Sequence, residues 1–136
     1  MKKGYKDNIE TVTVGNADFR HVLYTGTDMQ LVAMSLKPGE DIGVEVHPEN
    51  DQFFRFESGQ GKVVVNETEY EVSDDDVVIV PKGAEHNVIN TGEGDLKLYT
   101  IYAPPHHKEG TVHPTKEDAE AAEERGDEEF DGTTTE

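Results

Sequence analysis

The sequence predicts an all-β fold, a sandwich or a small barrel, for most of its 136 residues. Short runs rich in Val, Ile, Thr, Phe and Tyr recur along the chain, and turn residues separate them at a spacing of roughly 8–12 residues. No segment before residue 116 repeats its apolar residues with the period of an α-helix. This combination is typical of antiparallel sandwiches and barrels.

The expected strands follow one another as far as residue 102. They cover residues 11–14, 19–25, 29–36, 42–47, 52–57, 62–65, 69–72, 77–80, 86–90 and 96–102. Turn residues stand between them: Pro38 and Gly39 follow the third run, Pro48 ends the fourth, and Gly59 and Gly61 follow the fifth. The run 77–80 is apolar throughout, so we expect some strands to be buried on both faces.

The end of the chain differs in composition from the rest. Residues 116–136 carry ten acidic residues against Lys116 and Arg125, and they contain a single large apolar residue. Thr115 and Asp118 have the spacing of a capping box, and Gly126 can end a helix. We therefore expect a domain over residues 1–115, a short acidic helix from about 116 to 125, and a disordered tail from 127 to 136.

Charge and composition exclude several classes of function. Twelve Lys and Arg against 30 Asp and Glu give a formal net charge of -18, which argues against binding nucleic acid or an anionic membrane surface. The longest apolar run is too short to span a bilayer, and no apolar stretch follows the basic start as in a signal peptide. Without cysteine, any metal must be held by nitrogen and oxygen donors. A cytoplasmic protein is expected.

Two stretches carry polar residues and glycines at a regular spacing. The first reads Gly39, five residues, Glu45-Val46-His47, four residues, Gln52, six residues and Gly59, and the second reads Asp75, five residues, Pro81-Lys82-Gly83, two residues, His86, three residues and Asn90. Glu45 and His47 are two apart, so on one strand they share a face. Gln52 can lie on the next strand, and His86 follows a turn that can bring its strand alongside.

This spacing resembles the two motifs of the cupin superfamily, G(X)5HXH(X)3,4E(X)6G and G(X)5PXG(X)2H(X)3N, over residues 38–90. The sequence departs from them at Glu45, where the family has His, at Gln52, where it has Glu, and at Asp75, where it has Gly. The resemblance implies a small single-domain jelly-roll β-barrel with a metal ion inside it. It also implies a homodimer, in which residues 1–10 could form an arm that crosses between subunits.

The expected metal ligands are Glu45, His47, Gln52 and His86. They supply one carboxylate, one amide oxygen and two imidazoles, a set that suits one divalent transition metal: Fe, Mn, Zn, Co or Ni. An unpaired carboxylate facing a barrel interior is costly, so Glu45 should have a cation or a proton. A metal-free barrel that keeps the two histidines as hydrogen-bonded interior residues is the alternative.

Other candidates lie near this set. Tyr102 shares its strand face with Leu98 and Thr100 and should point inward, where its hydroxyl could reach a substrate. Phe54 and Phe56 have the parity of Gln52 and should fill the interior. His106, His107 and His113 follow the last strand, and the expected placement is an exposed loop. The alternative is a segment that folds back over the barrel mouth and supplies a substrate contact or an extra ligand.

These residues predict a metal-dependent enzyme that acts on a small oxygenated organic molecule, in an isomerase-like or a dioxygenase-like reaction. Glu45 would act as a base besides holding the metal, and Tyr102 is the second catalytic candidate. The alternative is a non-catalytic cupin that binds a small ligand. Lack of inward-facing cations argues against a sugar phosphate as substrate.

Overall fold

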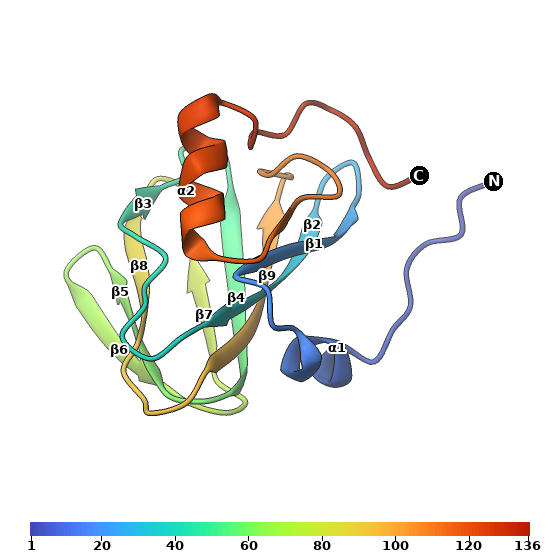
Figure 1. The fold of residues 1–136 in the computed structure, drawn as a ribbon. Helices are drawn as coiled ribbons and strands as arrows, with labels where there is room; N and C mark the ends of the chain where they lie inside the picture. Colours follow the sequence, from blue (N-terminus) through green and yellow to red (C-terminus); the bar gives the residue numbers. More distant parts are fainter.

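The computed structural model describes all 136 residues as two facing antiparallel sheets with two short helices (Figure 1). In chain order the elements are α1 (Ile9–Gly15), β1 (Arg20–Thr25), β2 (Gln30–Leu36), β3 (Glu45–Val46), β4 (Asp51–Ser58), β5 (Gly61–Val65), β6 (Thr68–Val72), β7 (Val77–Val80), β8 (Glu85–Asn90), β9 (Leu96–Ala103), β10 (Val112–His113) and α2 (Lys116–Arg125). The larger sheet has the order β10-β1-β2-β9-β4-β7, and the smaller one has the order β3-β8-β5-β6. The all-β jelly-roll prediction is confirmed.

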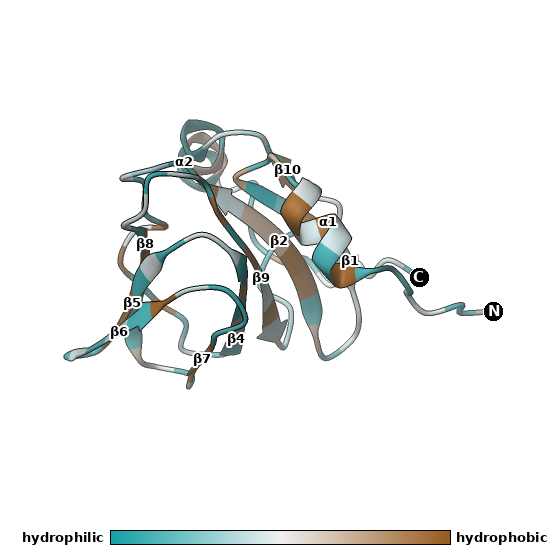
Figure 2. Ribbon diagram, turned by 90° about the horizontal axis from the view of Figure 1, so that it is seen from below, coloured by the Kyte–Doolittle hydropathy of each residue, from teal (hydrophilic) through white to brown (hydrophobic).

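Nine of the ten expected strands form, and the prediction of a strand over residues 11–14 was wrong. Residues 11–14 belong to α1, although Thr and Val favour strands. The Asn8 side chain caps this helix by accepting a hydrogen bond from the Thr11 backbone N–H. The helix packs against β2, β4 and β9 of the larger sheet and buries Thr13 completely (Figure 2). Packing on a sheet therefore outweighs the intrinsic preference of these residues.

The space between the sheets is filled by alternate residues of the strands. Phe54, Phe56, Leu98 and Thr100 have no exposed surface, and Tyr102 is almost as deeply buried. The parity arguments that placed them inside are confirmed. Because β4 and β9 lie side by side in the larger sheet, these residues form one continuous wall of the barrel interior.

The acidic helix forms at the expected residues, and its ends have the expected chemistry. Thr115 and Asp118 make the reciprocal hydrogen bonds of a capping box, and Gly126 ends α2 in the left-handed conformation. Lys116, in the first turn, pairs with Asp41 at 2.6 Å and so ties the helix to the loop before β3. Neither helix of the protein has the length and apolar character that crossing a membrane would need.

The residues after α2 differ from the disordered tail that we expected. The backbone N–H of Lys108 donates to Glu128 O at 2.9 Å, and that of Phe130 donates to His106 O at 3.0 Å. Thr135 N–H then donates to Thr25 O beside β1. These bonds lay the acidic end of the chain along the segment after β9 and bury Glu128, of which 8% is exposed.

Candidate metal centre

Three of the four predicted ligands come together where β3 pairs with β8. Glu45 stands directly opposite His86 in this antiparallel pair, and His47 follows β3 two residues after Glu45. Gln52 lies on β4 in the other sheet, directly opposite Tyr102. Gln52 is buried in the barrel interior, and its part in a metal site stays a prediction.

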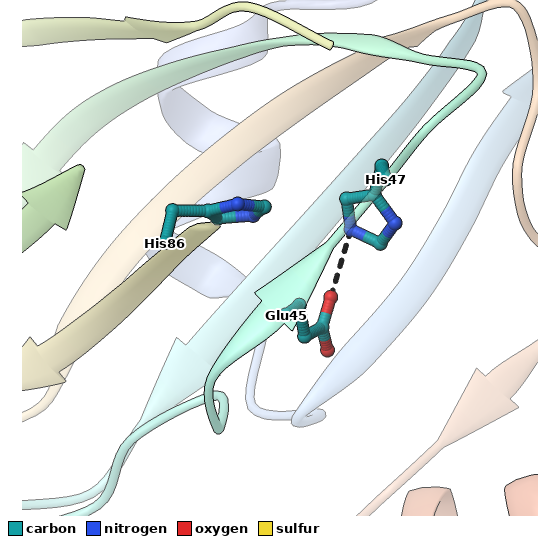
Figure 3. Close-up of side chains that lie close together, drawn as sticks. All are labelled: Glu45, His47 and His86. Carbon is teal, nitrogen blue, oxygen red and sulfur yellow. Dashed lines mark ion pairs between the residues drawn. The ribbon is translucent and has the colours of Figure 1, made fainter. Parts of the chain in front are cut away.

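Glu45, His47 and His86 point toward one another (Figure 3). One ligand atom from each of the three lies within 4.8 Å of the others. His47 Nε2 is 2.8 Å from Glu45 Oε2, but the contact is out of line for a hydrogen bond and leaves this nitrogen without a hydrogen-bond partner.

His86 is oriented so that one nitrogen remains free. Its Nδ1 lies 3.1 Å from the carbonyl oxygen of Ala84, which fixes Nδ1 as the protonated nitrogen. Nε2 then carries the lone pair, and it is buried without a partner. A backbone carbonyl that holds the far nitrogen of an imidazole is the usual support of a metal-ligating histidine.

Gln52 shows the same pattern with an amide. Its Nε2 donates to Thr100 Oγ1 at 3.0 Å, which leaves Oε1 as a buried oxygen without a partner. Only 2% of Gln52 is exposed, so this oxygen lies in the barrel interior. Three of the four predicted ligands therefore present a buried, unpartnered atom, and the fourth is the carboxylate of Glu45.

The charges at the site are set by burial and by the neighbouring groups. Burial lowers the pKa of His86, partly offset by the Ala84 carbonyl, so the imidazole is neutral near pH 7 and can act as a ligand. Burial raises the pKa of Glu45, but the close contact with His47 and the charge of Arg20 outweigh it and leave a net lowering. The site thus combines an ionised carboxylate with a neutral imidazole.

The prediction of an exposed loop for the other histidines was wrong. Gln30 Oε1 accepts hydrogen bonds from the backbone N–H groups of His106 and His107, and this folds the segment back over the barrel. His107 and His113 are buried, and His106 is half-buried with its ring centroid 4.3 Å from that of His47. The alternative placement over the mouth is the one that forms.

A cavity of about 280 Å³ lies between this segment and the candidate metal centre. Its lining consists of Arg20, Val44, Glu45, Val46, His47, His106, His107, Glu123 and Glu128. Arg20 and Glu128 were not among the predicted site residues. Arg20 Nη1 lies 3.3 Å from Glu128 Oε1, so an inward-facing cation is present but is already paired with a carboxylate.

Tyr102 is inward-facing as expected, but it does not line the cavity. Its hydroxyl lies 3.0 Å from His107 Nε2, and its ring packs edge-on against His47. Burial, the dominant effect, raises the pKa of this phenol well above its ordinary value. The hydroxyl therefore stays protonated and supports His107 in this structure.

Comparison with known proteins shows the family of the chain. The sequence model of the cupin domain matches residues 32–102. The chain belongs to the cupin family. This cupin is 50% identical over 127 residues to the Bacillus subtilis protein YrkC. The matched region covers 89% of this chain and 68% of YrkC. It is 39% identical to protein L612 of Acanthamoeba polyphaga mimivirus, covering 79% of this chain and 70% of that protein.

A solved structure has nearly the same fold. The crystal structure of BH2720 from Bacillus halodurans is 48% identical in sequence and superposes with a TM-score of 0.87, covering 88% of this chain and 96% of that one. The small single-domain type expected from the sequence is consistent with this match.

Proposed function

We propose that this cupin binds one divalent transition metal through Glu45, His47, Gln52 and His86 and acts as a metal-dependent enzyme on a small oxygenated organic molecule. One observation carries the proposal: the free donor atoms of His47, Gln52 and His86 are all buried without a hydrogen-bond partner. An unsatisfied buried polar atom costs about 1–3 kcal/mol. A single cation between these atoms and the Glu45 carboxylate would satisfy all of them.

The donor chemistry fits such an ion. Two neutral imidazoles, one amide and one carboxylate around a divalent ion give a site with a net charge of about +1, and nitrogen and oxygen donors of this kind suit Fe, Mn, Zn, Co or Ni. When bound, the ion supplies Lewis-acid polarisation of a substrate oxygen, or oxygen activation if it is iron. The metal-free alternative needs other partners for the same atoms, such as buried water molecules.

The cavity limits the substrate to a small molecule. Val44 and Val46 give it an apolar edge, and His106 and Glu123 give it a polar one. Glu45 belongs both to the cluster and to the cavity wall, and 28% of its side chain is exposed. A carboxylate in this position can accept a proton from a substrate held in the cavity. Tyr102 serves as a positioning residue for His47 and His107, since its hydroxyl is engaged.

The reaction belongs to one of two classes. The donor inventory resembles that of metal-dependent sugar isomerases with two His, one Glu and one Gln, and an isomerase-like reaction uses Glu45 as the base. A dioxygenase-like reaction needs iron and molecular oxygen. A non-catalytic cupin that binds a small ligand is the remaining alternative, and it needs no base at the cavity wall.

Metal content decides between these proposals. The purified full-length protein should contain about one tightly held transition metal ion per chain, and its removal by a chelator should lower the melting temperature. The double variant E45A/H47A should lose this ion. The control H21A should keep it, because His21 lies on β1 and pairs with Asp18 instead of the site residues. A protein that neither contains nor is stabilised by metal contradicts the proposal. Oxygen consumption with diols and catechols then separates dioxygenase from isomerase chemistry.

Assembly and location complete the proposal. We expect a homodimer, because the outer face of the larger sheet carries the exposed residues Val77 and Ile79 beside Phe53 and Tyr99. A cytoplasmic location remains the expectation from the sequence.

A further inference from the structure

A second group of metal-ligating side chains lines the same cavity. One ligand atom from each of His106, His107 and Glu128 lies within 4.8 Å of the other two. None of the three belongs to the cluster around Glu45. They come from the segment after β9 and from the acidic end of the chain, which the hydrogen bonds from Lys108 to Glu128 and from Phe130 to His106 hold side by side.

The buried imidazole of His107 lacks a partner on one side. Its Nε2 is taken by the Tyr102 hydroxyl at 3.0 Å. Its Nδ1 lies 2.5 Å from Glu128 Oε1, yet the contact is out of line and Nδ1 has no hydrogen-bond partner. Only 2% of His107 is exposed. Glu45 and His47 meet in the same way, close in distance but not in line.

We propose that His106, His107 and Glu128 form a second site for a divalent transition metal, separate from the ion held by Glu45, His47, Gln52 and His86. A cation beside the Glu128 carboxylate gives His107 Nδ1 the partner that this nitrogen lacks, and His106 supplies a third donor. Two imidazoles and one carboxylate with open positions form a set that suits Fe, Mn, Co, Ni or Zn. The Tyr102 hydroxyl then supports the far nitrogen of a ligating imidazole.

Arg20 makes this second site the weaker of the two. Its Nη1 lies 3.3 Å from Glu128 Oε1 and 3.4 Å from His113 Nδ1, so a positive charge stands beside the position of the cation. The net charge of -18 acts in the opposite direction, because it raises the concentration of cations near the protein. The two sites are neighbours, since the rings of His47 and His106 are in contact. One small ligand in the cavity can therefore touch both.

The site is tested by titrating metal-free full-length protein with Zn²⁺ in a calorimeter, with Ca²⁺ in excess to occupy surface carboxylates. The wild type should bind two ions per chain, the second more weakly. H106A/E128Q should bind one, at wild-type affinity for the first site. E45A/H47A should also keep one ion, bound weakly, so failure of the first site does not imitate failure of the second. The control H21A should bind both.

Two titration results would overturn the second site. In the first, the wild type binds a single ion, and E45A/H47A binds none. In the second, H106A/E128Q still binds two ions. Because H106A/E128Q removes a buried group, its far-UV circular dichroism is compared with the wild type, and E128Q alone serves if the double variant does not fold. Anomalous diffraction from crystals grown with Zn²⁺ gives an independent readout. A peak between His107 and Glu128 supports the site, and its absence when the first site is filled contradicts it.

Discussion

Glu45 and His86 are register partners in the β3–β8 pair, although they lie far apart in the sequence. The distance between their side chains is therefore set by a backbone ladder and not by a flexible loop. β8 is itself held on its other side by β5, where Val65 pairs with His86. This arrangement explains how a glutamate at the place of the first motif histidine remains within reach of the site: the ladder fixes the backbone, and either side chain can extend from it.

The hydrogen bond from Gln52 to Thr100 should control metal affinity without touching the metal. Thr100 Oγ1 accepts a hydrogen bond from Gln52 Nε2 at 3.0 Å. This bond fixes the orientation of the amide and leaves Oε1 without a hydrogen-bond partner. In T100V the shape is nearly conserved and the acceptor is lost, so we expect metal affinity to fall about 10- to 100-fold. Competition with a metal-binding dye measures the effect. T100S retains the hydroxyl and should behave like the wild type; an unchanged affinity in T100V would show that Gln52 is not a ligand.

The fold followed from local signals wherever the strand pattern and the tertiary packing agree. The parity of Gln52, Phe54 and Phe56 placed all three inside, because a strand alternates its faces regardless of its neighbours. At residues 11–14 the two conflict. The β-branched residues favour a strand, but the Asn8 cap and the contact with the larger sheet favour a helix. The sheet that stabilises this helix is formed by strands that come later in the chain, so the local sequence does not carry this contact.

The site was predictable only where its residues share a motif. Glu45, His47 and His86 followed from the spacing, since the first two are two residues apart in one extended segment and the third follows a fixed turn. Arg20 and Glu128 carried no local signal: Arg20 stands in an ordinary strand, and Glu128 lies in a segment whose acidity suggested only solubility. Their pairing depends on a chain reversal after α2 that composition does not reveal.

Gly59 should tolerate no side chain. Its φ is +105°, and an added Cβ would lie 2.6 Å from the carbonyl oxygen of Asp95. Strained backbone alone costs about 1–3 kcal/mol, and the clash with the backbone adds to it. We expect G59A to lower the free energy of unfolding in urea by more than G39A, because Gly39 has φ +81° but open space around it. Equal losses in the two variants would show that the close approach to Asp95 is unimportant.

Stability should depend on pH through the pair that anchors α2. The hydrogen bond from Lys116, helped by that from Asn87, lowers the pKa of Asp41 below its ordinary value. A carboxyl with a lowered pKa in the folded state stabilises the fold above its unfolded pKa, and the contribution disappears as the pH falls through the folded value. D41N should therefore be less stable than the wild type at neutral pH, by about 1 kcal/mol for so exposed a pair.

Thermal melts of metal-free protein between neutral pH and pH 3 check this dependence. The difference between wild type and D41N should shrink as the pH falls below the unfolded pKa of about 3.9. D28N, at an exposed turn residue, is the matched control and should follow the wild type. A gap between wild type and D41N that stays constant down to acid pH would mean that the charge of Asp41 contributes nothing.

The outer face of the larger sheet should hold the homodimer together. Val78 and Val80 of β7 point into the core, so Val77 and Ile79 point outward, with 52% and 64% of their surfaces exposed. Ile79 of β7 is the register partner of Phe53 on the neighbouring strand β4, and Phe53 lies beside Tyr99 of β9. Apolar residues that continue across neighbouring strands on one exposed face are typical of an interaction surface.

A lysine in the centre of this face should therefore separate the subunits. In a dimer that buries Ile79, the variant I79K would place two like charges in an apolar interface related by symmetry, and burying an unpaired charge is strongly unfavourable. Sedimentation equilibrium should give a dimer for the wild type and a monomer for I79K. Y70K changes another exposed large residue, on β6 of the smaller sheet, and should remain dimeric. A wild-type monomer, or an I79K dimer as tight as the wild type, would show that this face does not join two copies of the chain.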